Sequence, residues 1–144
     1  MTIIRETDDA TAVNEIGNDP TVRALMFLGA MYPPEYLDFS PWVEDPRNII
    51  LRDGGFVAMF VWRGPGIYEC HLMIRKDARG AQAMRIGRDM LSIVKSEGAH
   101  TVWGQPSIYN RAAICYIRRM GLKPAGFGTD AIAGEVQYFV TEGL

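Results

Sequence analysis

Hydrophobic positions follow two different periods along the chain, and each period predicts one kind of element. Short apolar runs bounded by glycine, proline or aspartate predict strands, whereas apolar residues at three- to four-residue spacing predict helices. The predicted strands are residues 3–5, 48–52, 56–62, 67–74, 101–104 and 135–140. Because glycine-containing turns separate the second, third and fourth of these segments, we expect them to form an antiparallel meander.

Helices are predicted where capping residues precede an apolar period and a glycine or proline follows it. The predicted helices run from the cap-type residues 7–9 to near residue 17, from 19–20 to about 28, from 81 to 97 and from 110 to 120. Residues 34–46, which are rich in proline and aromatic side chains, are predicted to form an irregular loop. This order of elements predicts an α+β fold, in which helices cover a mixed sheet.

Composition excludes several classes of protein. The chain has 144 residues, 48% of them hydrophobic, which suits one globular domain with its own core. Fifteen Lys and Arg against 17 Asp and Glu give a net charge of -2, so we expect no nucleic-acid partner. The longest apolar run, residues 24–32, is shorter than the ~20 residues of a membrane span, and the first residues lack a signal-peptide pattern. We therefore expect a cytoplasmic protein without a membrane partner.

The cysteines and histidines are few and widely spaced. Cys70 and Cys115 lie in separate apolar segments and have no CxxC spacing, so we expect buried, reduced thiols. His71 and His100 are the two histidines, and no carboxylate cluster accompanies them. The sequence therefore predicts no metal site.

Basic residues gather where the strand 67–74 gives way to the helix 81–97. The group consists of Arg75, Lys76, Arg79, Arg85 and Arg88. The short link 76–80 leaves bare N–H groups at a helix start, where the partial positive charge favours phosphate. Two interpretations stay open, a phosphate site and a solvated basic helix end.

The order strand, Arg79-Gly80, long helix, Gly98, strand, Asn110-x-x-Ala113, helix, Gly121 resembles the GNAT superfamily of N-acetyltransferases. The resemblance implies a mostly antiparallel sheet of about six to seven strands with helices on both faces, spanning residues 1–144 as one domain. It implies acyl transfer from acetyl-CoA or another acyl-CoA to a primary amine on a small molecule or protein. The implied CoA-binding residues are Arg79, Gly80, Ala81, Gln82, Ala83, Met84, Asn110 and Ala113, with backbone N–H groups near Met73 and Ile74 for the thioester.

Two positions depart from the family pattern. Gln82 and Met84 stand where the phosphate loop has glycines, and Ile117 stands where the family has its tyrosine acid. Tyr116 lies one residue earlier, a rotation of ~100° on a helix, and Tyr109 and Cys115 are further candidates for the acid. A second hypothesis is therefore a non-catalytic GNAT-like binding or structural module. A narrower resemblance is to divergent acetyltransferase-like proteins of tailed bacteriophages and prophages, some of them virion components.

The candidate base lies on the strand 67–74. Alternation puts Glu69, His71 and Met73 on one face of this strand and Cys70 on the other. His71 has a suitable ordinary pKa for a general base, and Glu69 is expected to orient it or to act through water. The other interpretation is that His71 only hydrogen-bonds a neighbouring strand or loop.

The resemblance implies that the loop before the meander covers the amine acceptor. Its aromatic residues are Tyr32, Tyr36, Phe39 and Trp42, and its acids are Glu35, Asp38, Glu44 and Asp45. The aromatics either shape a pocket or pack the loop in place, and the acids suit a cationic amine. The sequence does not reveal the oligomeric state; the resemblance implies that a homodimer would pair through an exposed final strand, residues 136–140.

Overall fold

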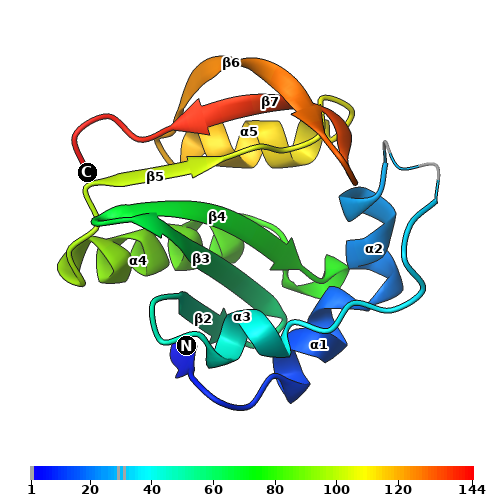
Figure 1. Ribbon diagram of the computed structural model, residues 1–144, viewed down its shortest axis with the longest axis horizontal. Coiled ribbons are helices and arrows are strands. Elements are labelled where there is room, and N and C mark those ends of the chain that lie inside the picture. Colours follow the sequence, from blue (N-terminus) through cyan, green and yellow to red (C-terminus); the bar gives the residue numbers. More distant parts are fainter. Residues whose placement is uncertain (1, 29, 31) are drawn as a thin grey trace.

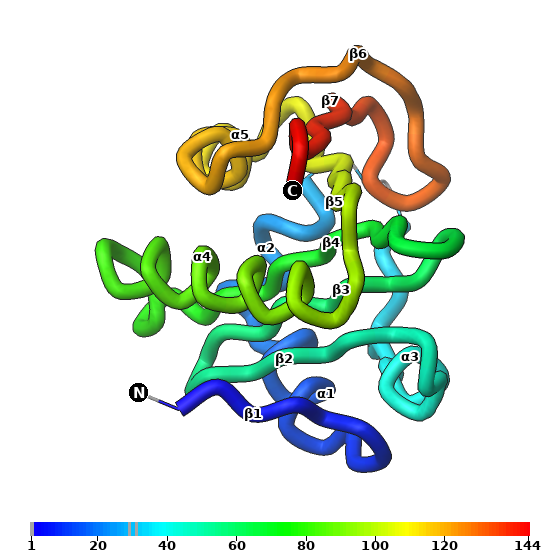
Figure 2. The backbone as a smooth tube through the Cα atoms, turned by 90° about the vertical axis from the view of Figure 1, so that its left-hand side faces the viewer, coloured from blue at the N-terminus to red at the C-terminus, as the bar shows by residue number. Residues whose placement is uncertain are grey.

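A seven-stranded sheet forms the centre of the computed structural model, which describes residues 2–28, 30 and 32–144. The strand order is β1-β2-β3-β4-β5-β7-β6, and Figure 2 shows these strands rising one above another. Their bounds are β1 Ile4–Glu6, β2 Ile49–Asp53, β3 Phe56–Gly64, β4 Ile67–Ile74, β5 Thr101–Gly104, β6 Lys123–Asp130 and β7 Gly134–Val140. Of these neighbours, β4 and β5 pair in parallel and the others pair antiparallel.

Helices cover both faces of the sheet (Figure 1). They are α1 Thr11–Gly17, α2 Pro20–Met26, α3 Ser40–Glu44, α4 Ala81–Ser96 and α5 Arg111–Arg119, with a 3-10 turn at Lys76–Ala78. One core cluster joins α4 to the sheet, and a second cluster joins α1, α2 and α3 to the opposite face. Adjacent residues such as Ile50 and Leu51 belong to different clusters, as strand alternation requires. None of the described helices has both the length and the apolar character needed to cross a membrane.

The predicted α+β class and the antiparallel meander are confirmed. Two elements were not predicted. The segment predicted as irregular contains α3, whose Pro41 stands at the start of the helix, a position where proline is favoured. The strand β6 was not predicted either, because Pro124, Gly126 and Gly128 hide any alternation. This segment becomes a strand by pairing with β7, with an irregularity in register after Pro124.

The expectation that the final strand is an exposed edge is wrong. The final strand β7 lies between β5 and β6 and pairs with both. The edge strand is β6, because the chain turns back at residues 131–133 and β7 inserts beside β5. Pairing of two copies through β7 is therefore blocked, and a homodimer stays a prediction.

The strands β4 and β5 are in register over three residue pairs only, from Ile67 with Thr101 to Glu69 with Trp103. Beyond Glu69 they diverge, as the two ribbons in Figure 1 show, while β4 continues to Ile74 beside β3. The Arg75 N–H donates to the Gly55 carbonyl on the β3 side, and N–H directions alternate along a strand. The N–H groups of Leu72 and Ile74 therefore face the diverging side, where no described strand pairs with them.

Candidate functional site

The carboxylate of Glu69 is buried between two basic side chains. Arg63 approaches one oxygen, Oε1, with Nη2 at 2.7 Å and Nε at 2.9 Å. The Nε2 atom of His71 lies 2.6 Å from Oε2, a close contact that is not aligned as a hydrogen bond. Burial by itself raises the pKa of Glu69, but the contacts with His71 and Arg63 outweigh burial and hold this pKa below its ordinary value. The site therefore holds an ionised carboxylate.

The structure brings Glu69 and His71 together on one face of β4, as strand alternation predicts. The His71 side chain is 31% exposed, so solvent and small molecules can reach the imidazole. The neighbouring carboxylate favours the tautomer with the proton on Nε2, which leaves the lone pair on Nδ1. Arg63 was not predicted, because the predicted strand 56–62 ends before it, whereas β3 continues to Gly64 and alternation then directs Arg63 to the face of Glu69.

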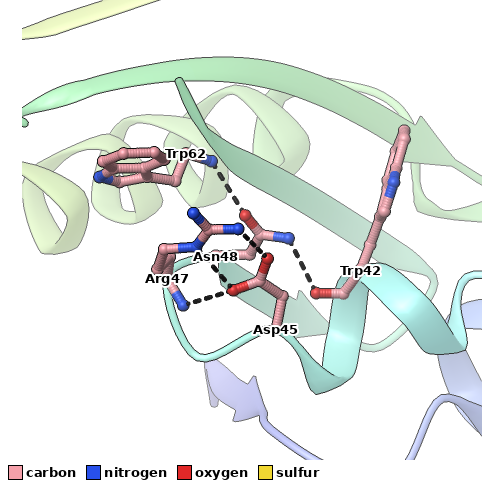
Figure 3. A network of polar contacts seen from close by, with 5 residues as sticks. All are labelled: Trp42, Asp45, Arg47, Asn48 and Trp62. Carbon is pink, nitrogen blue, oxygen red and sulfur yellow. Dashed lines mark hydrogen bonds and ion pairs between the residues drawn. The ribbon is translucent and has the colours of Figure 1, made fainter. Parts of the chain in front are cut away.

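Trp42 of α3 packs against His71, with ring centroids 5.2 Å apart and planes tilted by 41°. The buried Asn48 fixes this part of α3 to β3, as Figure 3 shows. Its Nδ2 donates to the Trp42 carbonyl at 3.0 Å, and its Oδ1 accepts from the Trp62 N–H at 2.9 Å. Asn48 was not predicted as a functional residue. The sequence feature that could have indicated it is a single amide side chain at the start of an apolar strand.

Arg47 covers the outside of the same junction (Figure 3). Its guanidinium contacts both carboxylate oxygens of Asp45, with Nε at 3.2 Å and Nη2 at 2.9 Å. The same group lies over the Trp62 ring, 4.8 Å from its centroid. Hydrogen bonds from Arg47 hold the pKa of Asp45 below its ordinary value.

Of the four aromatics predicted to shape an acceptor pocket, Trp42 is the one beside the candidate base. Phe39 is buried in the core cluster of α1, α2 and α3, which is the packing interpretation. Tyr32 and Tyr36 are 89% and 61% exposed.

The acids of the same segment divide into two pairs. Asp45 is engaged with Arg47, and Asp38 accepts from the side chains of Asn14 and Ser40. The Ser40 hydrogen bonds, with a smaller contribution from Asn14, lower the pKa of Asp38. Glu35 and Glu44 are exposed.

Arg79 ties the end of β4 to α2. Its Nε donates to the Ile74 carbonyl at 3.0 Å, and its Nη2 donates to the Thr21 carbonyl at 2.9 Å. The Lys76 N–H donates to the Thr21 hydroxyl oxygen at 3.2 Å, so the loop is fastened at two points. In this structure Arg79 therefore holds the loop in place, in addition to any contact with a ligand.

The first turn of α4 is open. Gly80 precedes it with φ +117, a conformation that favours glycine, and a β-carbon there would meet no atom within 4 Å. Ala81 and Gln82 are exposed, whereas Ala83 is buried and Met84 packs against the core. Within the part of the chain that the structure describes, no side chain caps the helix, so the N–H groups of residues 81–83 have no helical partner and suit an anion. Of the two residues that replace the family glycines, Gln82 is therefore exposed and Met84 is turned toward the core.

Asn110 and Tyr116 both form internal hydrogen bonds. Oδ1 of Asn110 accepts from the Ala113 N–H at 3.1 Å and caps α5. The Tyr116 hydroxyl donates to the Ala83 carbonyl at 2.6 Å, which joins α5 to α4. Burial raises the pKa of Tyr116 well above its ordinary value. Tyr116 packs against the α4 cluster, on the other side of β4 from His71.

The other two candidates for the acid are both exposed. Tyr109 is 61% exposed, and Cys115 is exposed on α5. Exposure at Cys115 contradicts the expectation that both thiols are buried, because this residue lies on the solvent side of α5. Burial raises the pKa of Cys70 to about 12, so that thiol is inert.

No protein-family model and no curated protein matches the sequence. Solved structures do match. A ribosomal-protein-alanine N-acetyltransferase from Brucella melitensis is 17% identical with a TM-score of 0.74, and the match covers 100% of this chain and 100% of that one. A variant of spermidine N-acetyltransferase from Vibrio cholerae is 13% identical with a TM-score of 0.73, covering 98% of this chain and 94% of that one. AAC(6')-Ib in complex with ribostamycin and coenzyme A is 16% identical with a TM-score of 0.72, covering 97% and 92%.

At these identities the likeness concerns the fold, and it extends over essentially the whole chain. The chain has the GNAT fold. Ile117, which stands where the GNAT motif has tyrosine, lies next to Gly104 of β5, with its Cδ1 3.9 Å from where a β-carbon of that glycine would lie. An aliphatic side chain therefore faces β5 at the point where this strand begins to diverge from β4.

Proposed function

We propose that residues 1–144 form one cytoplasmic, acyl-CoA-dependent N-acyltransferase domain that moves an acetyl or other acyl group to a primary amine by direct attack. The observation that carries this proposal is the divergence of β4 from β5 beyond Glu69, beside the open first turn of α4, in a chain with the GNAT fold. Structures of the similar AAC(6')-Ib with coenzyme A or acetyl-CoA support it.

The residues present fit an acyl-CoA. The N–H groups of residues 81–83 would bind its pyrophosphate at the positive end of α4. The N–H groups of Leu72 and Ile74, which face the diverging side of β4, would hold the acyl end and polarise a carbonyl. The register favours these two groups, because alternation directs the Met73 N–H toward β3. Acyl-CoA supplies an activated thioester when bound.

Glu69 and His71 would handle the proton of the amine. His71 accepts this proton on Nδ1, and the ionised Glu69 stabilises the imidazolium. The new C–N bond forms as the donor's C–S bond breaks, and the thiolate takes a proton from the site or from water. A covalent route through Cys70 is disfavoured, because burial keeps this thiol protonated.

One observation favours a second candidate function, a non-catalytic GNAT-like binding or structural module such as a virion-associated protein of a phage. Ile117 cannot donate a proton, and the Tyr116 hydroxyl is already bonded to the Ala83 carbonyl. Proton transfer contributes about 10²–10⁴-fold to a rate, so its loss slows an enzyme without abolishing it. Binding of acyl-CoA alone does not distinguish the two functions, whereas turnover does.

The test begins with calorimetric titration of the protein with acetyl-CoA and with CoA. We expect a micromolar Kd, about -8 kcal/mol. Gln82→Glu places a negative charge in the exposed first turn of α4, where it repels phosphate but interacts favourably with the helix dipole. It should weaken acetyl-CoA binding tenfold or more and leave Tm unchanged or higher.

Ser92→Glu is the matched control, because Ser92 is exposed on the same helix but lies far from its first turn. This variant should bind acetyl-CoA as the unmodified protein does. No heat and no thermal stabilisation at millimolar acetyl-CoA would reject the acyltransferase proposal.

A further inference from the structure

Two half-buried aromatic side chains, Trp103 of β5 and Tyr138 of β7, belong to neither core cluster among the described residues. Their rings lie edge to face, with centroids 6.3 Å apart. Large aromatic side chains usually contribute to a core, and those left at the surface together often mark a binding site. The sequence analysis gave neither residue a function.

The fold places this pair beside the candidate base. In the parallel register Trp103 is the partner of Glu69, so both residues point to the same face. Their neighbours Val102 and Phe139 are buried in the α4 cluster, which directs Trp103 and Tyr138 to the opposite face, the side of Glu69 and His71. Trp42 contacts His71 on that side from α3. Indole rings therefore lie on both sides of the Glu69–His71 pair.

The acids around the Glu69–His71 pair differ in what holds them. Glu69 is neutralised by Arg63 and contacts His71. Asp130 of the neighbouring hairpin accepts from Gln105 and from the N–H groups of residues 132 and 133. Asp38 and Asp45 are engaged as described above, and the exposed Glu35 and Glu44 are screened by water. Glu69 and Asp45 have cationic partners, whereas Asp38 and Asp130 are held by neutral donors and keep their negative charge. These acids attract amines in general, so the aromatic rings select among amines.

We infer that the acceptor of the proposed transfer is a monoamine carried on an aromatic ring, with the ring held by Trp103 and Tyr138 and the amine directed to His71. This inference rests on the proposed function. A stacked ring gains contact area with both aromatics, and a single ammonium group is attracted by an indole face before it loses its proton. Trp103 is thus a specificity-determining residue.

The test measures acetylated product by mass spectrometry with acetyl-CoA and either 2-phenylethylamine or spermidine. The kcat/KM for 2-phenylethylamine should exceed that for spermidine at least tenfold. Trp103→Ala should lower kcat/KM for 2-phenylethylamine tenfold or more, mainly through KM, and Trp103→Phe should restore much of it. Phe127→Ala, which removes a 73% exposed aromatic from β6, is the control and should leave both values unchanged.

Each outcome separates the inference from the proposed function. Faster acetylation of spermidine, or an equal loss for both amines in Trp103→Ala, would overturn the aromatic acceptor and leave acyl transfer standing. Binding of acetyl-CoA without acetylation of 2-phenylethylamine would also overturn it. Failure of the protein to bind acetyl-CoA would reject the proposed function itself. The substrate ratio of the unmodified protein decides the matter even if Trp103→Ala does not fold.

Discussion

Glu69 is the residue on which the candidate base depends. Its carboxylate is buried and remains ionised because Arg63 and His71 compensate for the loss of water. The side chain of Arg63 is 46% exposed, so this cation still reaches solvent while it neutralises the buried charge. A buried carboxylate with such partners makes folding depend on pH.

Acid should therefore destabilise the protein partly through Glu69. A carboxyl whose pKa is lowered in the folded state contributes stability above its unfolded pKa, about 4.3, and loses it as pH falls through the lower folded pKa. Glu69→Gln removes this contribution. Urea unfolding at about pH 7, 5 and 3.5 should show a smaller loss of stability with acid in Glu69→Gln than in the unmodified protein.

Glu44→Gln is the control, because Glu44 is exposed and should not change the pH dependence. Identical acid dependence in Glu69→Gln and the unmodified protein would contradict the lowered pKa of Glu69.

At the scale of the elements, the contact between α4 and α5 explains why glycine stands at position 87 and tyrosine at position 116. Gly87 weakens a helix interior by about 0.5–1 kcal/mol relative to alanine. A β-carbon there would collide with the Tyr116 hydroxyl, which bonds to the Ala83 carbonyl. The missing side chain of Gly87 therefore leaves the space in which the Tyr116 hydroxyl reaches α4.

Substitutions at this contact should be coupled. Gly87→Ala should destabilise the protein by about 1–3 kcal/mol despite the better helix former, because of the collision. Tyr116→Phe should cost about 0.5–1.5 kcal/mol from the lost hydrogen bond. The double variant should lose less than the two losses together, measured as free energies of unfolding in urea.

Ser92→Ala, at an exposed position of α4, should show no such coupling to Tyr116→Phe. A stabilising effect of Gly87→Ala in the presence of Tyr116 would show that the helices do not approach this closely. Retention of kcat in Tyr116→Phe would exclude its hydroxyl as the acid.

The whole molecule consists of one sheet with a helical layer on each face, and β3 contributes side chains to the core under both layers. Phe56, Ala58 and Phe60 enter the cluster of α4, while Val57 and Met59 enter the cluster of α1, α2 and α3. The edge strand β6 differs, because residues 123–127 are exposed. Opening β6 therefore disturbs little apolar packing, whereas opening β3 disturbs both clusters.

Amide hydrogen exchange should show this difference. The amides of β3 should exchange only through global unfolding, and those of β6 should exchange faster through local opening. Mass spectrometry of peptic fragments after labelling in D₂O gives both rates. Equal protection of β3 and β6 would mean that β6 is covered, as it would be by a second copy of the chain.

Local patterns predicted much of the fold and part of the site. The strands at residues 67–74 and 101–104 match their predicted bounds, and the helix from 81 ends within a residue of its prediction. Alternation alone placed Glu69 and His71 on one face of β4, and Asn110 capped a helix as its residue type suggests. These features depend on residues close together in the sequence, where period and capping act directly.

Tertiary structure decided the rest. The extension of β3 to Gly64 beside β4 brought Arg63 to Glu69, and packing of α5 on Gly87 turned Tyr116 toward Ala83. The insertion of β7 beside β5 made β6 the edge and set Trp103 and Tyr138 on the side of His71. No local period encodes these contacts, because each depends on which strands and helices lie side by side, and burial of the whole core selects that arrangement.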